Sequence, residues 1–405
     1  MAITINTEPS SGGLKLAYRP YIYTFTYSGV PTVVNCVVEV VVNSVRVAAK
    51  SVQLDLASST DFTVDIRSEL QKYVSFELKT LGSSGVITGD DGINSVQLKI
   101  YEVTENPSTL LLDTNYDPAD ANNSSYDAIS SVSQFMNWTE THLEYDTFDI
   151  EDYRLTATTK KFLSESPLVK DIELDQNEFI GILWHQGLSA QNFRLEVLTY
   201  DSSDALLNTD VISISEWTSA YAGNVVNPYL SLGVGTANLA AAGVSFTNVA
   251  YYTIKIINIT GDVSETRRFN IVPSCGDDVR VHWANKFGKQ ESLTFKGNTV
   301  ETVTTATNSF ESPLSNTYSS SDRGTTTIQT ARSNSFDVYT KSVGRSIYQL
   351  AASIAYNNDA YVEIGGSYFP ITIEDISVVK SDNEDMPIQF ALRYRFANRD
   401  KGLRG

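Results

Sequence analysis

The chain has 405 residues, of which 41% are hydrophobic, and a formal net charge of −18. This length exceeds that of one ordinary β-sandwich and predicts several domains, and the apolar content excludes an intrinsically disordered chain. The negative charge argues against nonspecific binding to nucleic acid and to anionic membrane surfaces.

The first predicted module covers residues 1–165. Its strands alternate apolar with polar residues and are rich in β-branched and aromatic side chains: 21–27, 33–42 and 96–103. A short helix is expected at 66–74, with Asp65 as its cap and Glu69 in its first turn. Residues 116–133 are rich in Asp, Asn and Ser and predict a long surface loop.

The second module, 166–275, repeats this pattern. Strand-like runs such as 193–200 and 251–257 are separated by Gly, Asn and Asp clusters that favour turns. Strands at regular spacing with turn residues between them are typical of a β-sandwich.

The third module, 276–405, differs because its strands at 301–308 and 325–335 are rich in Thr and Ser and lack long apolar runs. Such strands often pair with neighbouring chains or line a ring, although an ordinary sheet with two polar faces fits as well. A short helix is expected at 346–355. We predict an all-β, multidomain fold, with β-sandwich modules of the immunoglobulin or fibronectin type and a C-terminal mixed β-rich assembly domain.

Residues suited to catalysis or metal binding are sparse. The three histidines are scattered along the chain: His142, His185 and His282. No HExxH, Gly-x-Ser-x-Gly or phosphate-binding loop is present, and the glycines of Gly233-Val-Gly235 lack the third glycine of a dinucleotide fingerprint. Cys36 and Cys275 are too few for a disulfide framework. We therefore expect no enzyme, no catalytic residue, no cofactor and no bound transition metal.

Carboxylates leave two alternatives open. Three clusters are compatible with weak calcium binding, although turn formation explains them better: Asp90-Asp91, Asp201/Asp204 and Asp382/Glu384/Asp385. A glycosidase pair would need two carboxylates that face one cleft about 5–10 Å apart, which a sequence does not reveal.

Four segments carry a resemblance to a known group of proteins. The segment 279–297 reads as a strand, an Asn285-x-x-Gly288 turn and a Glu-x-x-x-Phe strand; the others are 62–73, 361–373 and 390–396. This arrangement resembles tail-associated structural proteins of tailed bacteriophages that infect Bacteroidetes. The pattern departs from that group at Lys289, where a second glycine is usual. The resemblance implies a tail or baseplate structural protein without catalytic residues.

The C-terminal segment, residues 390–405, is basic in an otherwise acidic chain, and Asp400 is its single acidic residue. Five cations are candidate assembly residues: Arg393, Arg395, Arg399, Lys401 and Arg404. On a strand, the first two project from one face, and Leu392 and Tyr394 from the other. We expect the apolar face to close the core and the basic face to be free to meet an acidic surface of a neighbouring subunit, although a solvated tail without a partner is the alternative.

These features predict a virion structural protein that assembles into a ring or hub. Its expected partners are further copies of itself and other virion proteins, with a host-surface glycan as a further candidate, and neither nucleic acid nor membrane insertion is expected. The sequence contains no run of about 18 consecutive apolar residues, so we expect no membrane-spanning helix. Residues 1–10 lack the basic and apolar regions of a secretory signal, so we expect synthesis in the host cytoplasm and a place in the virion. A carbohydrate-binding, adhesin-like receptor-recognition protein is the main alternative, and a polysaccharide depolymerase is the second.

Overall fold

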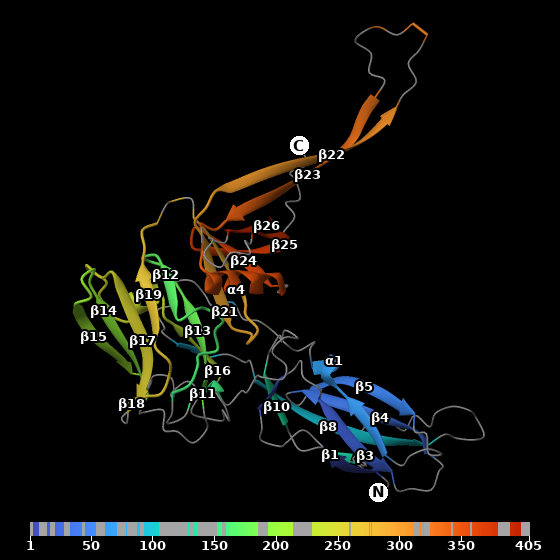
Figure 1. Cartoon of the computed structure of the whole chain (residues 1–405). Helices are drawn as coiled ribbons and strands as arrows, with labels where there is room; N and C mark the ends of the chain where they lie inside the picture. Colours follow the sequence, from blue (N-terminus) through green and yellow to red (C-terminus); the bar gives the residue numbers. More distant parts are fainter. Residues whose placement is uncertain are drawn as a thin grey trace.

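The computed structural model describes a defined part of the chain, which comprises residues 3–7, 14–16, 21–27, 33–42, 45–53, 61–70, 78, 87–89, 93–104, 128–129, 133–136, 152–155, 159–184, 193–213, 229–258, 261–274, 276, 278–311, 316–317, 319, 325–341, 343–356, 359–379 and 389–397. Strands dominate, and they form five mainly antiparallel sheets in three domains (Figure 1). The prediction of an all-β, multidomain fold with β-sandwiches is confirmed. The loop predicted at 116–133 lies mostly outside the described residues.

The N-terminal domain is a sandwich of two sheets. The first has the order β1 (Ile3–Thr7), β3 (Ile22–Tyr27), β6 (Asp61–Asp65). The second has the order β2 (Leu14–Leu16), β10 (Ser133–Met136), β8 (Ile93–Thr104), β4 (Val33–Val42), β5 (Val45–Gln53), with β9 (Ala128–Ile129) on β8. Alternate residues of β3, β4 and β8 meet in the core, because successive side chains of a strand point to opposite faces.

The predicted helix near residue 66 is confirmed as α1 (Arg67–Leu70). Asp65 begins it as expected, since its Oδ1 accepts a hydrogen bond of 2.9 Å from the Arg67 backbone N–H. Residues 71–74 of the predicted helix lie outside the described part of the chain.

The middle domain is the second sandwich. One sheet has the order β11 (Arg154–Leu155), β13 (Phe179–Trp184), β16 (Tyr229–Gly233), β7 (Ile87–Gly89). The other has the order β12 (Val169–Ile172), β19 (Arg267–Ile271), β17 (Tyr251–Asn258), β14 (Arg194–Tyr200), β15 (Leu206–Ser213), with β18 (Gly261–Asp262) on β17.

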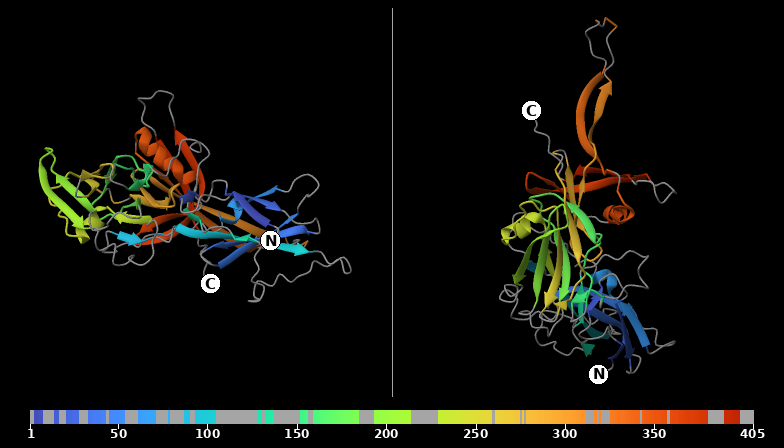
Figure 2. Two further views of the ribbon diagram at one scale, coloured as in Figure 1. Left: turned by 90° about the horizontal axis from the view of Figure 1, so that it is seen from below. Right: turned by 60° about the vertical axis from the view of Figure 1, so that its left-hand side comes forward.

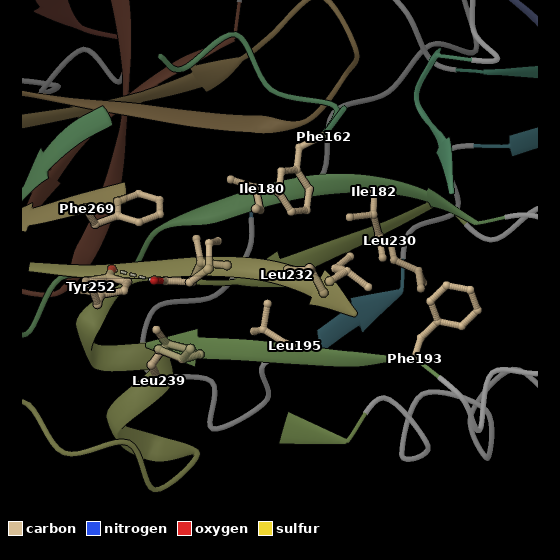
Figure 3. Close-up of a cluster of buried hydrophobic side chains, with 14 of the residues drawn as sticks. Phe162, Ile180, Ile182, Phe193, Leu195, Leu230, Leu232, Leu239, Tyr252 and Phe269 are labelled. Carbon is tan, nitrogen blue, oxygen red and sulfur yellow. Dashed lines mark hydrogen bonds between the residues drawn. The ribbon is translucent and has the colours of Figure 1, made fainter. Parts of the chain in front are cut away.

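The core of the middle domain includes residues that precede the boundary predicted at residue 165. Leu155 and Phe162 are buried in it, and Figure 3 shows the Phe162 ring beside Ile180. Strand β7, from the N-terminal third of the chain, also adds an antiparallel edge to its first sheet. The helix α3 (Thr236–Ala241) was not predicted, and it buries Leu239 in the same core.

The C-terminal domain is one seven-stranded sheet with the order β21 (Gln290–Phe295), β20 (Val279–Ala284), β24 (Ala360–Ile364), β25 (Ser367–Val379), β26 (Gln389–Phe396), β23 (Thr325–Tyr339), β22 (Thr299–Glu311). The helix predicted at 346–355 is confirmed as α4 (Arg345–Ser353), followed by the 3-10 turn η5 (Ile354–Tyr356). It packs Leu350 and Ile354 against the sheet, and Ser353 accepts a 3.0 Å hydrogen bond from Trp283 Nε1.

Candidate assembly site

The most exposed element of the described chain is a two-stranded arm, made of β22 and β23. Figures 1 and 2 show the arm extending from the C-terminal domain well beyond the other strands. All thirteen residues of β22 are exposed. The strand pairs antiparallel with β23 along its whole length and occupies the outer edge of the sheet. One row of its backbone N–H and C=O groups therefore faces solvent.

The arm also exposes large apolar side chains. Val300, Val303 and Phe310 of β22 are 47%, 46% and 55% exposed, and Ile328 of β23 is 73% exposed. Ile328 is the extra residue of a β-bulge opposite Asn308 and Ser309, so the irregularity lies in β23 and β22 stays regular. These apolar side chains on a projecting element are accessible to a partner.

The base of the arm is fixed to the domain core. Val338 of β23 is buried, and Asp337 beside it accepts two hydrogen bonds from Arg393, at 2.7 and 3.0 Å. Gly297, just before β22, donates a backbone hydrogen bond of 2.8 Å to Tyr339, and a Cβ at Gly297 would lie 2.5 Å from the Tyr339 carbonyl oxygen. The arm therefore leaves the domain in a defined direction.

The predicted basic strand is present as β26. Phe390, Leu392 and Tyr394 are buried in the core, and Arg393 and Arg395 lie on the opposite face, as the alternation predicted. The basic face is not free, however, because both arginines pair with carboxylates of their own domain. Arg393 forms the two-hydrogen-bond pair with Asp337, and Arg395 Nε lies 3.4 Å from Glu374. The sequence did not reveal these partners, because they lie on separate strands. Arg399, Lys401 and Arg404 lie outside the described residues.

A buried ionic cluster joins the middle and C-terminal domains. Glu178, at the start of β13, is 2% exposed and accepts hydrogen bonds from Lys170 Nζ at 2.8 Å, Arg280 Nη2 at 2.9 Å and Ser292 Oγ at 2.7 Å. Burial opposes the ionisation of Glu178, but the two cations outweigh it and hold the pKa of this carboxyl below its usual value. We call these four residues the interdomain junction.

A hairpin of the C-terminal domain extends this junction. The turn predicted at Asn285 and Gly288 is confirmed: Gly288 has a φ of 69°, and the Asn285 side chain accepts backbone hydrogen bonds from Phe287 and Lys289. The Asn285 amide donates to the Leu163 carbonyl at 3.1 Å. Next to the turn, Glu291 accepts a 2.6 Å hydrogen bond from Ser166 Oγ. The middle and C-terminal domains are therefore in contact at a turn and along two strands.

His282 is the buried histidine of the C-terminal sheet. Its Nε2 lies 2.9 Å from Glu363 Oε2, and its Nδ1 lies 3.0 Å from the Gln290 amide nitrogen. Burial lowers the pKa of His282 to about 4, against the opposing effect of Glu363. The neutral ring therefore donates to Glu363 and accepts from Gln290. His142 and His185 lie outside the described residues.

The described residues contain no group of three or more His, Cys, Asp and Glu side chains placed to hold a metal ion. Asp201 forms a turn, since its Oδ1 accepts the backbone N–H groups of Ser203 and Ala205 at 2.8 and 2.9 Å. The other two candidate calcium clusters, at 90–91 and 382–385, lie outside the described residues. Within the part that the structure describes, no helix has the length and apolar character to cross a membrane.

Comparison with known proteins identifies no family. No protein-family model matches the chain, and no curated protein does. Among solved structures, Drosophila OTK extracellular domains 3–5 share 10% identity over 91% of this chain and 94% of that chain, with a TM-score of 0.25. A trypsin-activated alpha-2-macroglobulin from Escherichia coli shares 9% over 84% of this chain and 19% of that chain, with a TM-score of 0.21. Fibronectin(III)-like modules of Clostridium thermocellum CbhA share 10% over 66% and 92% of the two chains, with a TM-score of 0.16. Superpositions this poor leave the function to be inferred from the chain's own residues.

Proposed function

We propose that this chain is a structural subunit of a bacteriophage tail or baseplate, which assembles into a ring or hub through its arm. The observation that carries the proposal is the exposed, thirteen-residue edge strand β22 on an arm anchored at its base. The resemblance of four segments to tail-associated proteins of Bacteroidetes phages supports the virion part of the proposal. Further copies of the chain and other virion proteins are the expected partners.

The interdomain junction supports a mechanical role for the body of the subunit. Glu178, Lys170 and Arg280 are 2%, 5% and 6% exposed, and the pair of Arg280 with Glu178 ties the C-terminal domain to the middle domain. An arm transmits position to a neighbouring subunit only if the body that carries it is rigid. In this proposal the buried junction holds the body of the subunit together, and the exposed arm contacts the neighbouring subunit.

The direct test shortens the arm and leaves the body intact. Because Thr302 pairs with Ser335, residues 303–334 can be replaced by the two-residue turn Asn-Gly, which favours a tight hairpin. The buried residue Val338 stays in place, so we expect the variant to fold. Sedimentation velocity and electron micrographs should show rings or larger assemblies for the full chain and monomers for the short-arm variant.

Two outcomes overturn the proposal: a full chain that remains monomeric at high concentration, or a short-arm variant that assembles as well as the full chain. Antibodies against the chain should also label the tail end of the phage particles whose genome encodes it. Binding of a monomeric full chain to a host polysaccharide would instead favour the receptor-recognition alternative.

A further inference from the structure

We propose that β22 pairs antiparallel with β22 of a second copy of this chain, about a two-fold axis at Thr305. The inference rests on the proposed function and names the partner of the arm. It would join the arms of two subunits into one four-stranded sheet, with the two bodies at opposite ends.

The edge of β22 carries two carboxylates, Glu301 and Glu311, but lacks the other devices that protect exposed strands. Natural proteins block such edges with Lys, Pro or a bulge on the edge strand. Residues 299–311 contain no Lys, Arg, Pro or Gly, and the bulge of the arm lies in β23. The described residues place no strand on the outer side of β22. An unprotected edge of thirteen residues is a template for an added strand.

The side chains of β22 are compatible with its own sequence as the partner. When two copies of β22 pair antiparallel, all thirteen residues find a partner only in the register centred on Thr305. In that register Thr299 of each copy lies opposite Glu311 of the other. Val300 of each copy also lies opposite Phe310 of the other. The dimer therefore contains two such pairs of exposed apolar residues, one on each side of the axis. Cross-strand pairs of aromatic and β-branched residues contribute roughly 0.2–1 kcal/mol each.

Charge also favours this register. Glu301 lies opposite Ser309, whereas a shift of the strands by two residues in one direction would place Glu301 opposite Glu311 of the other copy. Like charges directly opposite each other destabilise a strand pair. Glu301 is further occupied within its own arm, because its Oε1 accepts a 2.6 Å hydrogen bond from the Asn334 amide. Since every pairing is reciprocal, the interface is isologous and joins copies in pairs, so a ring or hub of such pairs also needs a second contact elsewhere on the subunit.

The antiparallel register fixes where the two bodies lie. Thr299, the first residue of β22, pairs with the buried Val338 of β23, and β22 runs outward from there along the arm (Figure 1). Antiparallel pairing places the base of one arm beside the distal end of the other. The two bodies therefore lie on opposite sides of the axis.

Disulfide trapping tests the register. In the full-length chain, Thr305→Cys places a cysteine opposite itself, at a Cα separation of about 4.5–5.5 Å that a disulfide spans. Thr302→Cys is the matched control, because residue 302 lies opposite Asn308 and not opposite itself. We expect oxidised Thr305→Cys to form a covalent dimer that reductant reverses, and Thr302→Cys to form one only when mixed with Asn308→Cys. The wild-type chain, with Cys36 and Cys275, gives the background.

A second variant tests the interaction without cysteines. Thr305→Lys places two ammonium groups on the axis and should weaken dimerisation at least tenfold by sedimentation, whereas Thr305→Val should keep it. Equal yields of covalent dimer from Thr305→Cys and Thr302→Cys would overturn the self-pairing. A Thr305→Lys protein that dimerises as strongly as wild type would do so as well. If those results occur and the short-arm variant still fails to assemble, the proposed function stands and the arm binds a different partner.

Discussion

Arg280 of the C-terminal domain donates a hydrogen bond of 2.9 Å to Glu178 of the middle domain, and the side chains of both residues are buried, at 7% and 2% exposed. Lys170 adds a second cation on the same carboxylate, so the junction holds two positive charges and one negative charge. Glu291, with its hydrogen bond to Ser166 close by, adds a further buried carboxylate. A buried charge is tolerated only when its partners are in place. The two domains are therefore expected to unfold together.

The first prediction concerns Glu178→Gln. Removing this negative charge leaves Lys170 buried without its ion-pair partner and leaves Arg280 with only the longer contact to Glu363, at 3.5 Å, which costs about 3–5 kcal/mol in the free energy of unfolding. Urea denaturation followed by tryptophan fluorescence measures the change. Lys255→Met is the control, because Lys255 pairs with Glu196 and Asp262 at a more exposed site, where a pair contributes about 1 kcal/mol or less. Equal effects of the two variants would contradict a special role for the junction.

The second prediction concerns pH. The pKa of His282 is lowered to about 4 in the folded chain, so the unfolded chain binds a proton that the folded chain does not between pH 6.5 and about 4. Stability contributed by the neutral ring is complete above pH 6.5 and decreases as the pH falls through this window. The decrease amounts to at most about 3 kcal/mol. His282→Gln, which keeps a side chain that can donate and accept, should flatten the curve of unfolding free energy over this range.

Comparing wild type with His282→Gln also separates the titration of His282 from that of other groups. His142 and His185 remain in the variant, so any part of the curve that they cause stays unchanged. Glu363 and Glu178 have lowered pKa values, so the stability that they contribute is lost as the pH falls from the usual range of a carboxyl downward, at the acid end of the His282 window. Identical curves for wild type and His282→Gln would refute the assignment to His282.

Local signals of the sequence predicted much of the fold. Asp65 before an apolar-periodic run identified α1, and alternation identified β26 with its buried Phe390 and Leu392. The helix α3 was missed because it has six residues and begins after Gly235 without a capping side chain of the usual kind. Gly235 is instead needed for space, since a Cβ there would lie 2.3 Å from the Glu178 backbone nitrogen.

The junction was not predictable by such reasoning, because its partners are distant in the chain. Glu178 and Arg280 are 102 residues apart, and nothing local distinguishes Glu178 from a solvated carboxylate. The one available signal was position: Lys170 and Arg280 stand within strands, and Arg280 lies between two valines, where a charge must be exposed or paired. The Thr- and Ser-rich composition distinguished the strands at 301–308 and 325–335, but it did not predict that all thirteen residues of β22 are exposed, because that depends on how the whole domain packs.

The third prediction tests the packing between the two domains. A Cβ at Gly181 would lie 2.4 Å from Lys289 Cγ and 2.9 Å from Leu163 Cβ, where the hairpin of the C-terminal domain meets β13. Gly181→Ala should therefore force one of these side chains to move and lower the free energy of unfolding by about 1–3 kcal/mol. Thermal unfolding should show a lower midpoint.

Gly344→Ala provides the comparison for this variant. A Cβ at Gly344 meets nothing within 4 Å, and Gly344 has an ordinary φ of −70° at the start of α4. We expect a change of less than about 1 kcal/mol there, as for an N-cap glycine. A Gly181→Ala protein as stable as the Gly344→Ala protein would show that Lys289 adapts freely.

The last prediction concerns the basic C-terminal segment. Arg393 and Arg395 already pair with Asp337 and Glu374, so a role in assembly falls mainly on the cations that follow them: Arg399, Lys401 and Arg404. Deletion of 398–405 removes these charges and leaves the buried residues of β26 in place. We expect the truncated monomer to keep its unfolding midpoint and to assemble more slowly and with a weaker dependence on salt, because complementary charge mainly sets partner and association rate. Replacing the three cations by Gln in the full-length chain should reproduce this effect. Sedimentation velocity across a series of salt concentrations measures both variants, and assembly that matches the full-length chain in rate and salt dependence would exclude a role for the tail.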